Sequence, residues 1–418
     1  MSTSLFLLVR KEIPVDQSLR LRRIHSNNDK FVAQANDLHD KFHDKGYSQS
    51  GINKGHLIPE KAKLDSLMLG HLSGLHCDTV LDKTSIPNID FLPATAEDYE
   101  ELMSMSSGLY NGLDYLPFRY DSWLKEPQRT MFVAKCEGKV VGFTSIILVD
   151  DGTTAGVEDL RVAPWIRGHG VAGLIRKCFL ETLHSNHPEV KRLRFTRDEN
   201  PPASMLTTFK VISSKAVMSV YIPADQLKTT LGLLESGVNN LDRSKKLSVL
   251  GPEEILCFFE ESKTKQPLLP GGLLIQDCLP LTTHKSNLNF LLKRRIVWIY
   301  SHPGDSSDSA SSSKDTTSCN GSHANLEGFL SLGSPPYPVP FAEGAHCLDI
   351  DMFGNDPSYA KVHVIEQLKI GVQALPAGSS IICIIYADES LRSELGQLCE
   401  GLTPFDNSRE QMIMEMEI

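Results

Sequence analysis

The sequence has little that would suit an extracellular or membrane-spanning protein. Its nine cysteines are scattered and odd in number, and no two are spaced C-x-x-C, so neither a disulfide framework nor a zinc knuckle is indicated. Mostly apolar runs such as residues 140–149 fall short of the roughly 18–20 residues that a transmembrane helix needs. Residues 5–9 are too short for a signal-peptide core. We therefore expect a cytoplasmic protein with no membrane partner.

Basic charge and metal-ligand spacing are lacking as well. The 42 basic and 52 acidic residues give a net charge of −10, which disfavours a nucleic-acid partner. His39 and His43 lie four residues apart in a helix predicted over residues 30–45, but no third ligand accompanies them. We expect no metal site.

The 418 residues, 41% of them hydrophobic, suffice for more than one folded domain. Residues 1–88 form a poorly defined N-terminal extension, and residues 89–222 carry the clearest alternation of strand and helix patterns. Residues 223–418 fit a second α/β domain, interrupted by a flexible Ser-rich insertion at residues 305–325. The sequence leaves the role of this second domain and the oligomeric state open.

Periodicity predicts the order β-α-β-β-β-α-β-α-β for residues 89–222. Three strands joined by tight turns form an antiparallel meander that ends at Val162, and an amphipathic helix begins at Val171. The predicted strands are residues 89–93, 130–135, 139–149, a strand ending at 162, 191–196 and 215–222, and the helices begin near 96, 171 and 201. In the second domain we expect strands at residues 295–300 and 381–386 and a helix over residues 362–375.

The loop between the meander and the amphipathic helix carries the clearest chemistry. It fits the pattern Arg/Gln-x-x-Gly-x-Gly/Ala, which suits a pyrophosphate. Glycines at 168 and 170 let the backbone approach closely, amides at a helix N-terminus bind an anion, and Arg167 adds positive charge. The predicted cradle is Arg167, Gly168, His169, Gly170, Val171 and Ala172.

The same letters also match the dinucleotide pattern Gly168-x-Gly170-x-x-Gly173. That pattern follows the first strand of a parallel βαβ unit, whereas here the preceding strand ends an antiparallel meander. An acyl-CoA is therefore the preferred ligand, with a nicotinamide cofactor and an ordinary Gly-rich loop as alternatives.

Residues 157–172 (VEDLRVAPWIRGHGVA) resemble the acetyl-CoA signature of the GNAT superfamily of N-acetyltransferases. Residues 112–124 (GLDYLPFRYDSWL) and 195–198 (FTRD) are similar to the vertebrate histidine N-acetyltransferases within it, as are residues 269–277 (LPGGLLIQD) and 349–354 (DIDMFG). The resemblance covers about residues 89–418. It implies a mixed, splayed α/β (α+β) sheet flanked by helices, with a second α/β domain after it.

The resemblance further implies transfer of an acetyl group from acetyl-CoA to the α-amino group of free L-histidine, a small-molecule substrate. In such enzymes two parallel strands splay apart and pantetheine pairs with the exposed backbone, here expected at Leu160, Arg161 and Val162. Asn200 falls where many members place an asparagine beside the cofactor. Many members also carry a general-acid tyrosine where this sequence has Thr207.

A neutral amine must attack, so a carboxylate near the splay has to accept its proton. Glu158 is the first candidate and Asp159 the second, because both precede the splay and neighbouring strand residues alternate faces. The alternative for either residue is an exposed strand-edge carboxylate. We expect backbone amides of the splayed strand to stabilise the oxyanion.

The segment that covers the acceptor site in this superfamily is rich in polar and aromatic side chains. Arg119 suits the carboxylate of histidine, and Asp114 suits its imidazole. The tyrosines would form an aromatic wall or pack the helix against the sheet. The candidate substrate residues are Tyr110, Asp114, Tyr115, Arg119 and Tyr120. Other acceptors, such as another amino acid or a protein lysine, and a non-catalytic acyl-CoA-binding role stay open.

Overall fold

The computed structural model describes residues 89–106, 108–238, 247–261, 268–301, 328–405 and 409–418. The N-terminal extension with its predicted helix at residues 30–45, and the Ser-rich insertion at residues 305–325, lie outside the described residues. We call residues 89–222 the first half and residues 223–418 the second half.

The first half has the predicted order of elements. Asp98 accepts a hydrogen bond from the backbone N–H of Thr95 at 2.8 Å and so closes the capping box that starts the first helical segment. The strands are β1 (Ile89–Pro93), β2 (Arg129–Cys136), β3 (Lys139–Val149), β4 (Thr154–Val162), β5 (Arg192–Asp198) and β6 (Lys210–Ile222). The helices are α3 (Tyr99–Met105), α4 (Leu116–Trp123), α5 (Val171–Asn186) and α6 (Ala203–Leu206).

The second half is also α/β, and its three predicted elements are confirmed as β10, β14 and α10. Its strands are β7 (Leu247–Val249), β8 (Leu273–Gln276), β9 (Leu279–Thr282), β10 (Val297–Ser301), β11 (Phe329–Gly333), β12 (Tyr337–Pro338), β13 (Ala345–Phe353), β14 (Ser380–Ala387), β15 (Thr403–Pro404) and β16 (Glu410–Glu417). Its helices are α7 (Leu227–Val238), α8 (Pro252–Glu261), α9 (Lys285–Lys293), α10 (Pro357–Gln373) and α11 (Arg392–Leu398).

One mixed sheet joins the two halves, and its strand order reads alike from both ends. The order is β1-β2-β3-β4-β5-β16-β6-β14-β13-β11-β10-β7, with β12 and β15 beside this path and β8–β9 as a separate hairpin. From either end, antiparallel strands lead to a single parallel pair, β4–β5 or β13–β14, which is joined through a long helix, α5 or α10. The chain therefore contains the same architecture twice.

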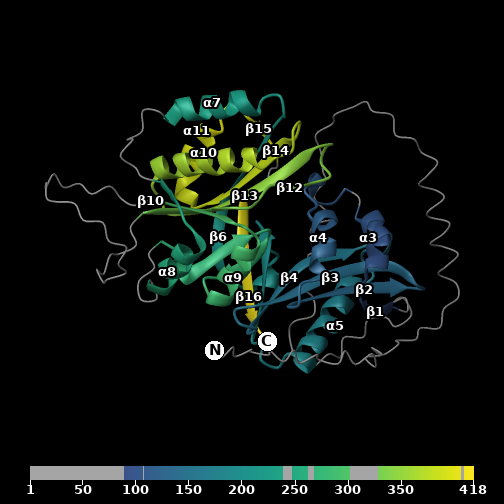
Figure 1. Cartoon of the computed structure of the whole chain (residues 1–418). Coiled ribbons are helices and arrows are strands. Elements are labelled where there is room, and N and C mark those ends of the chain that lie inside the picture. Colours follow the sequence, from purple (N-terminus) through teal and green to yellow (C-terminus); the bar gives the residue numbers. More distant parts are fainter. Residues whose placement is uncertain (1–88, 107, 239–246, 262–267, 302–327, 406–408) are drawn as a thin grey trace, which may run out of the picture.

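The centre of the sheet is formed by strand exchange. β16, from the end of the chain, pairs with β5 of the first half, while β6 of the first half pairs with β14 of the second. β16 and β6 also pair with each other. In Figure 1, β16 runs between the two halves of the molecule. Each half thus contributes one strand to the part of the sheet that the other half forms. The sheet is therefore continuous across the boundary between the halves, which follows Ile222 at the end of β6.

Helices cover both faces of this sheet. In the first half, α3 and α4 lie on one side of β2 and β3 and α5 lies on the other (Figure 1). Gly142 of β3 has room only for hydrogen, because a Cβ there would meet Ile175 of α5 at 2.5 Å. In the second half, α7, α10 and α11 pack on one side and α8 and α9 on the other. The β8–β9 hairpin packs with α8 and α9 in a hydrophobic core that also includes Ile147 and Val149 of β3.

Candidate active site

The parallel pair of the first half opens into a splay. β4 and β5 pair only at three positions, from Thr154 with Arg192 to Gly156 with Arg194. Both strands continue beyond these pairs, so the edge of β4 over residues 157–162 has no strand partner on its β5 side within the described part of the chain. The divergence predicted at residues 160–162 is present and begins three residues earlier.

The predicted anion cradle lies where β4 ends and α5 begins. Gly168 and Gly170 have φ of +85° and +81°, a region that side chains rarely adopt, and a Cβ on either would meet no atom within 4 Å. Gly170 precedes a helix of 16 residues whose first turn holds no acidic residue. Backbone amides at a helix N-terminus therefore face open space, an arrangement suited to phosphate oxygens.

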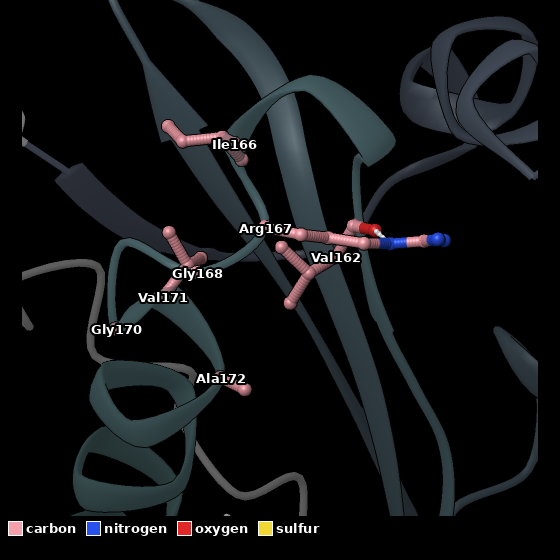
Figure 2. A pocket seen from close by; sticks show the side chains of 7 residues that line it. All are labelled: Val162, Ile166, Arg167, Gly168, Gly170, Val171 and Ala172. Carbon is pink, nitrogen blue, oxygen red and sulfur yellow. Dashed lines mark hydrogen bonds between the residues drawn. The ribbon is translucent and has the colours of Figure 1, made fainter. Parts of the chain in front are cut away.

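Arg167 borders the cradle at the end of β4. Its Nε donates a hydrogen bond to the carbonyl of Val162 at 3.0 Å, and Figure 2 shows the side chain extended toward that strand end. The hollow is lined by Val162, Ile166, Arg167, Gly168, Gly170, Val171 and Ala172. His169 is exposed, and its ring nitrogen lies 3.1–3.2 Å from the backbone carbonyls of Ile166 and Arg167. The residues present thus fit a pyrophosphate.

The remaining residues predicted near the cofactor are placed differently from one another. Asn200 is exposed just after β5, with φ of +60°. Thr207 is exposed at the end of α6, and its hydroxyl donates to the carbonyl of Ser204 at 2.7 Å. Leu160 is partly buried on β4, whereas the guanidinium of Arg161 belongs to a buried ionic network.

A β-bulge sets the direction of the two candidate carboxylates. The pairing of β3 with β4 shifts register between Phe143 and Ser145, and Asp159 has φ of +61°. An extra residue in one strand breaks the alternation of faces. Glu158 bonds Arg129 at the start of β2, and that guanidinium lies over Trp123 of α4. Asp159 bonds Arg161, which in turn bonds Asp114 just before α4.

Glu158 is held by an arginine. Its Oε2 accepts from Nη1 of Arg129 at 2.6 Å, and the two side chains are almost completely buried. The guanidinium of Arg129 also bonds Ser145 and lies 3.9 Å from the ring centroid of Trp123 on α4. Glu158 is thus part of a fixed ion pair beneath α4.

Asp159 lies in a second network with one free oxygen. Its Oδ1 accepts from Arg161, and Arg161 in turn makes a bidentate pair with Asp114 at 2.6 and 2.7 Å. The Oδ2 of Asp159 is buried with no hydrogen-bond partner among the described residues. Burial raises the pKa of Asp159 to about 6, and the nearby charges of Asp114 and Glu158 add to this against the opposing effect of Arg161.

Tyr110 reaches the same carboxylate from the segment before α4. Its hydroxyl is 3.5 Å from Oδ1 of Asp159, and its ring lies 5.6 Å from the guanidinium carbon of Arg161. Although 49% of the residue is exposed, burial of the hydroxyl end and the charge of Asp159 raise its pKa. Tyr110 therefore stands between solvent and the splay.

Of the other predicted substrate residues, Tyr115 and Tyr120 lie in the core of the first half, and Arg119 contacts the second half. Tyr115 is buried against the edge of Trp123. Tyr120 is 2% exposed, and its hydroxyl donates to the carbonyl of Thr95 at 2.6 Å, so it fastens α4 within the core. Arg119 instead reaches the second half, where its Nη2 lies 2.5 Å from Oδ2 of Asp277.

Sequence reasoning assigned no chemistry to the second half, yet the structure places polar groups there beside Arg119. Asp277 in the β8–β9 turn is 2% exposed and also bonds Arg294 at 3.2 Å. On β13, Asp349 accepts a hydrogen bond from Tyr337 at 3.1 Å. The signal was present in the two quoted stretches, residues 269–277 and 349–354, but these side chains meet only through the fold.

Among the described residues, no group of three or more His, Cys, Asp or Glu side chains has an arrangement that would hold a metal ion. In the same part of the chain, no helix has the length and apolar character needed to cross a membrane.

Comparison with known proteins agrees with the splay and the cradle in defining an acetyltransferase. Residues 95–203 match the acetyltransferase (GNAT) family, and residues 243–388 match the C-terminal domain of histidine N-acetyltransferase. The chain belongs to the GNAT family of N-acetyltransferases, which use acetyl-CoA as co-substrate. The expected fold class and enzyme class are confirmed.

The similar proteins extend this match to most of the chain. The human protein named "Probable N-acetyltransferase 16" is 32% identical over 79% of this chain and 86% of its own length. Histidine N-acetyltransferase of Scomber australasicus is 30% identical over 82% of this chain and 99% of its own length. Among solved structures, a tandem GNAT protein from the clavulanic acid biosynthesis pathway aligns with a TM-score of 0.47 and 14% identity, over 79% of this chain and 98% of that one.

Proposed function

We propose that this protein transfers the acetyl group of acetyl-CoA to the α-amino group of free L-histidine. The observation that carries the proposal is the buried, unpartnered Oδ2 of Asp159 beside a splay whose far end is an open helix N-terminus. The similarity to histidine N-acetyltransferases over most of the chain supports histidine as the acceptor. A cytoplasmic location stays a prediction from the cysteine pattern.

Acetyl-CoA supplies the acetyl group as a thioester when it is bound. In this proposal the amides of residues 168–172 and the charge of Arg167 hold its pyrophosphate, and the unpaired edge of β4 at Leu160, Arg161 and Val162 offers backbone groups to its pantetheine arm. Asn200, just after β5, borders the same opening. Backbone N–H groups of this β4 edge stabilise the oxyanion of the tetrahedral intermediate.

Asp159 is the better general base of the two carboxylates. Each carboxylate has one oxygen held by an arginine at 2.6 Å and one buried oxygen without a described partner, so the pKa and the neighbouring Tyr110 decide between them. The pKa of about 6 for Asp159 lies close to neutral pH, where a base is both largely ionised and able to take a proton from an ammonium group. We therefore place Glu158 in the support of β4 and Asp159, beside Tyr110, at the amine.

Thr207 occupies the position at which many family members carry a tyrosine that protonates the leaving thiolate, and its hydroxyl donates to the carbonyl of Ser204. The hydroxyl of Tyr110 lies 3.5 Å from Oδ1 of Asp159, and we propose that it passes the proton taken up by Asp159 on to the leaving thiolate. Both oxygens of Asp114 accept from Arg161, and the Nη2 of Arg119 is paired with Asp277, so both residues shape the acceptor site mainly through their ion pairs.

The proposal is tested with purified protein, acetyl-CoA and a panel of free amino acids, with thiol release as the readout. We expect release with histidine well above every other amino acid. Release with another amino acid, or only with lysine-containing peptides, would replace histidine as the acceptor. Tight CoA binding without release on any acceptor would make the protein a non-catalytic acyl-CoA-binding relative.

A further inference from the structure

Asp349 differs from the other buried carboxylates. In the described part of the chain, the buried acidic residues Asp98, Asp114, Glu158, Asp159, Asp277 and Asp351 each form an ion pair with a lysine or arginine. Asp349 is 4% exposed and has no such pair there. Its oxygens are met by the hydroxyl of Tyr337 at 3.1 Å and the thiol of Cys347 at 3.9 Å. Burial and the charge of Asp277 raise the pKa of Asp349 to about 7 against the opposing charge of Arg119, so a ligand that donates a hydrogen bond would favour its ionised form.

Unpartnered buried polar atoms also occur on β8, β16 and α4. The Oε1 of Gln276 is buried with no hydrogen-bond partner among the described residues, while its Nε2 is 3.4 Å from Asp277. The Oε1 of Gln411 and the Nε of Arg119 are likewise without described partners. Native proteins leave few buried polar groups unpaired. Each unpartnered oxygen is suited to a ligand N–H group, and the arginine donor to a ligand carboxylate.

The β8–β9 hairpin connects this cluster to the splay. A Cβ on Gly156, the last paired residue of β4, would meet Leu279 of β9 at 2.8 Å. Thr196 of β5 donates to the carbonyl of Cys278 at 2.6 Å. On the other side, the N–H of Ile275 donates to Asp351 at 2.8 Å, two residues from Asp349 on β13. The hairpin thus bridges the opening of the parallel strands and β13.

We propose that Asp349, oriented by Tyr337, recognises the acceptor by accepting a hydrogen bond from the imidazole N–H of histidine. The inference rests on the proposed function and assigns the specificity of that site to the second half of the chain. The amine lies at Asp159, and the ring extends along the hairpin to Asp349. An aliphatic or phenyl side chain leaves the carboxylate buried and unpaired, and so binds poorly.

The test is the steady-state kinetics of Asp349→Asn, with Asp225→Asn as the control. Asp225 is exposed, so its substitution makes the same chemical change on the surface of the second half. We expect the KM for histidine to rise roughly ten- to a hundredfold in Asp349→Asn, as for a lost hydrogen bond to a charged group, with the KM for acetyl-CoA unchanged. The control keeps both values, and Tyr337→Phe raises the KM for histidine less than Asp349→Asn.

The wild-type enzyme gives a second readout that does not depend on folding of a variant. Methylation of either ring nitrogen removes the N–H of the neutral imidazole, so we expect both ring-methylated histidines to be at least tenfold poorer acceptors. Histidine selectivity with an unchanged KM in a folded Asp349→Asn, or methylated histidines used as well as histidine, overturns the inference and leaves the proposed function standing. A wild-type enzyme that does not acetylate histidine overturns both.

Discussion

The two halves of the sheet share one strand order but treat their parallel pair differently. β4 and β5 pair at three positions and then part, whereas β13 and β14 pair at seven, from Ala345 with Ser380 to Asp351 with Tyr386. The N-cap residue of α5 is Gly170, and the first turn of this helix holds no acidic residue. The N-cap residue of its counterpart α10 is Asp356, whose carboxylate accepts from the amides of Ser358 and Tyr359.

The difference teaches where this architecture keeps its chemistry. An acyl-CoA needs an unpaired strand edge and free amides at a helix N-terminus, and only the first half offers both among the described residues. In the second half the edge is used by β14 and the amides by Asp356. We infer that the second half has become a support that completes the sheet through β16 and presents Asp277 and Asp349 to the first.

Removing the carboxylate of Asp159 should have the largest effect. In Asp159→Asn we expect kcat to fall roughly a hundred- to ten-thousandfold, the usual contribution of a general base. In the wild type, kcat/KM should rise with pH up to about 6 and then level off, because Asp159 must be ionised to accept a proton. The variant should lose this rise. The measurement is a pH profile of thiol release.

The matched variant is Glu158→Gln, which keeps the shape of the neighbouring carboxyl but breaks its pair with Arg129. We expect it to keep the dependence on a group of pKa about 6 and to lower the unfolding temperature, since the buried guanidinium of Arg129 loses one of its two carboxylate partners and keeps only Glu126. A normal pH profile in Asp159→Asn together with a lost one in Glu158→Gln would assign the base to Glu158.

Because its pKa is raised, Asp159 contributes less to folding stability at neutral pH than at acidic pH. Because the pKa of Asp159 is higher in the folded protein than the ordinary 3.8, folding favours its protonated form. Its contribution to stability is therefore fully present below pH 3.8 and is lost as the pH rises through about 6. Comparing the unfolding temperatures of the wild type and Asp159→Asn from pH 5 to pH 8 checks the sign, since the variant should gain on the wild type as the pH rises.

A carboxylate introduced into the first turn of α5 should weaken CoA binding, because it would occupy the helix N-terminus as Asp356 does in α10. Gly173 is in that turn, and a Cβ there would meet no atom within 4 Å, so a side chain is accommodated. In Gly173→Asp we expect the Kd for CoA, measured by calorimetry, to rise roughly tenfold or more, because two anions then share one site. Gly173→Ala is the control and should bind CoA normally. Equal affinity in both variants would contradict the placement of the pyrophosphate.

Most of the first half could be predicted from periodicity, and the active carboxylates only in part. The amphipathic pattern after Val171 and the capping box at Thr95 are local signals, and the structure confirms both elements. The bulge at Asp159 is not local in this sense, because it depends on how β3 and β4 align. Alternation along the strand therefore could not orient the two carboxylates, and the choice of Asp159 over Glu158 as the base is a proposal from the structure.

The second half shows the limit more clearly. Its strands and its long helix are visible in the sequence, but strand exchange depends on pairs such as Gln411 with Asp198, which are far apart along the chain. The cluster around Asp349 combines side chains from β13, the hairpin turn and α4, and no spacing in the sequence brings them together. Two motifs were recognisable by resemblance, while their shared site was not.

Arg167 should contribute less to CoA binding than the helix amides do. It already donates to the carbonyl of Val162, so part of its bonding capacity serves the strand end. We expect Arg167→Ala to raise the Kd for CoA by roughly three- to tenfold, as for one exposed charge-assisted contact, with kcat nearly unchanged. Arg392→Ala, at the start of α11 in the second half, is the matched control. An unchanged Kd in Arg167→Ala would remove Arg167 from the cradle.

The variant with the smallest expected effect tests whether Asp356 alone prevents CoA from binding to the second half. Asp356→Ala removes the cap of α10, which should lower the free energy of unfolding by about 1 kcal/mol. Because β13 and β14 stay paired over seven positions, no strand edge becomes available, and the stoichiometry of CoA binding should remain one per chain. Calorimetric titration of the variant gives this number directly. A second bound CoA would mean that Asp356, and not the closed strand pair, separates the two halves.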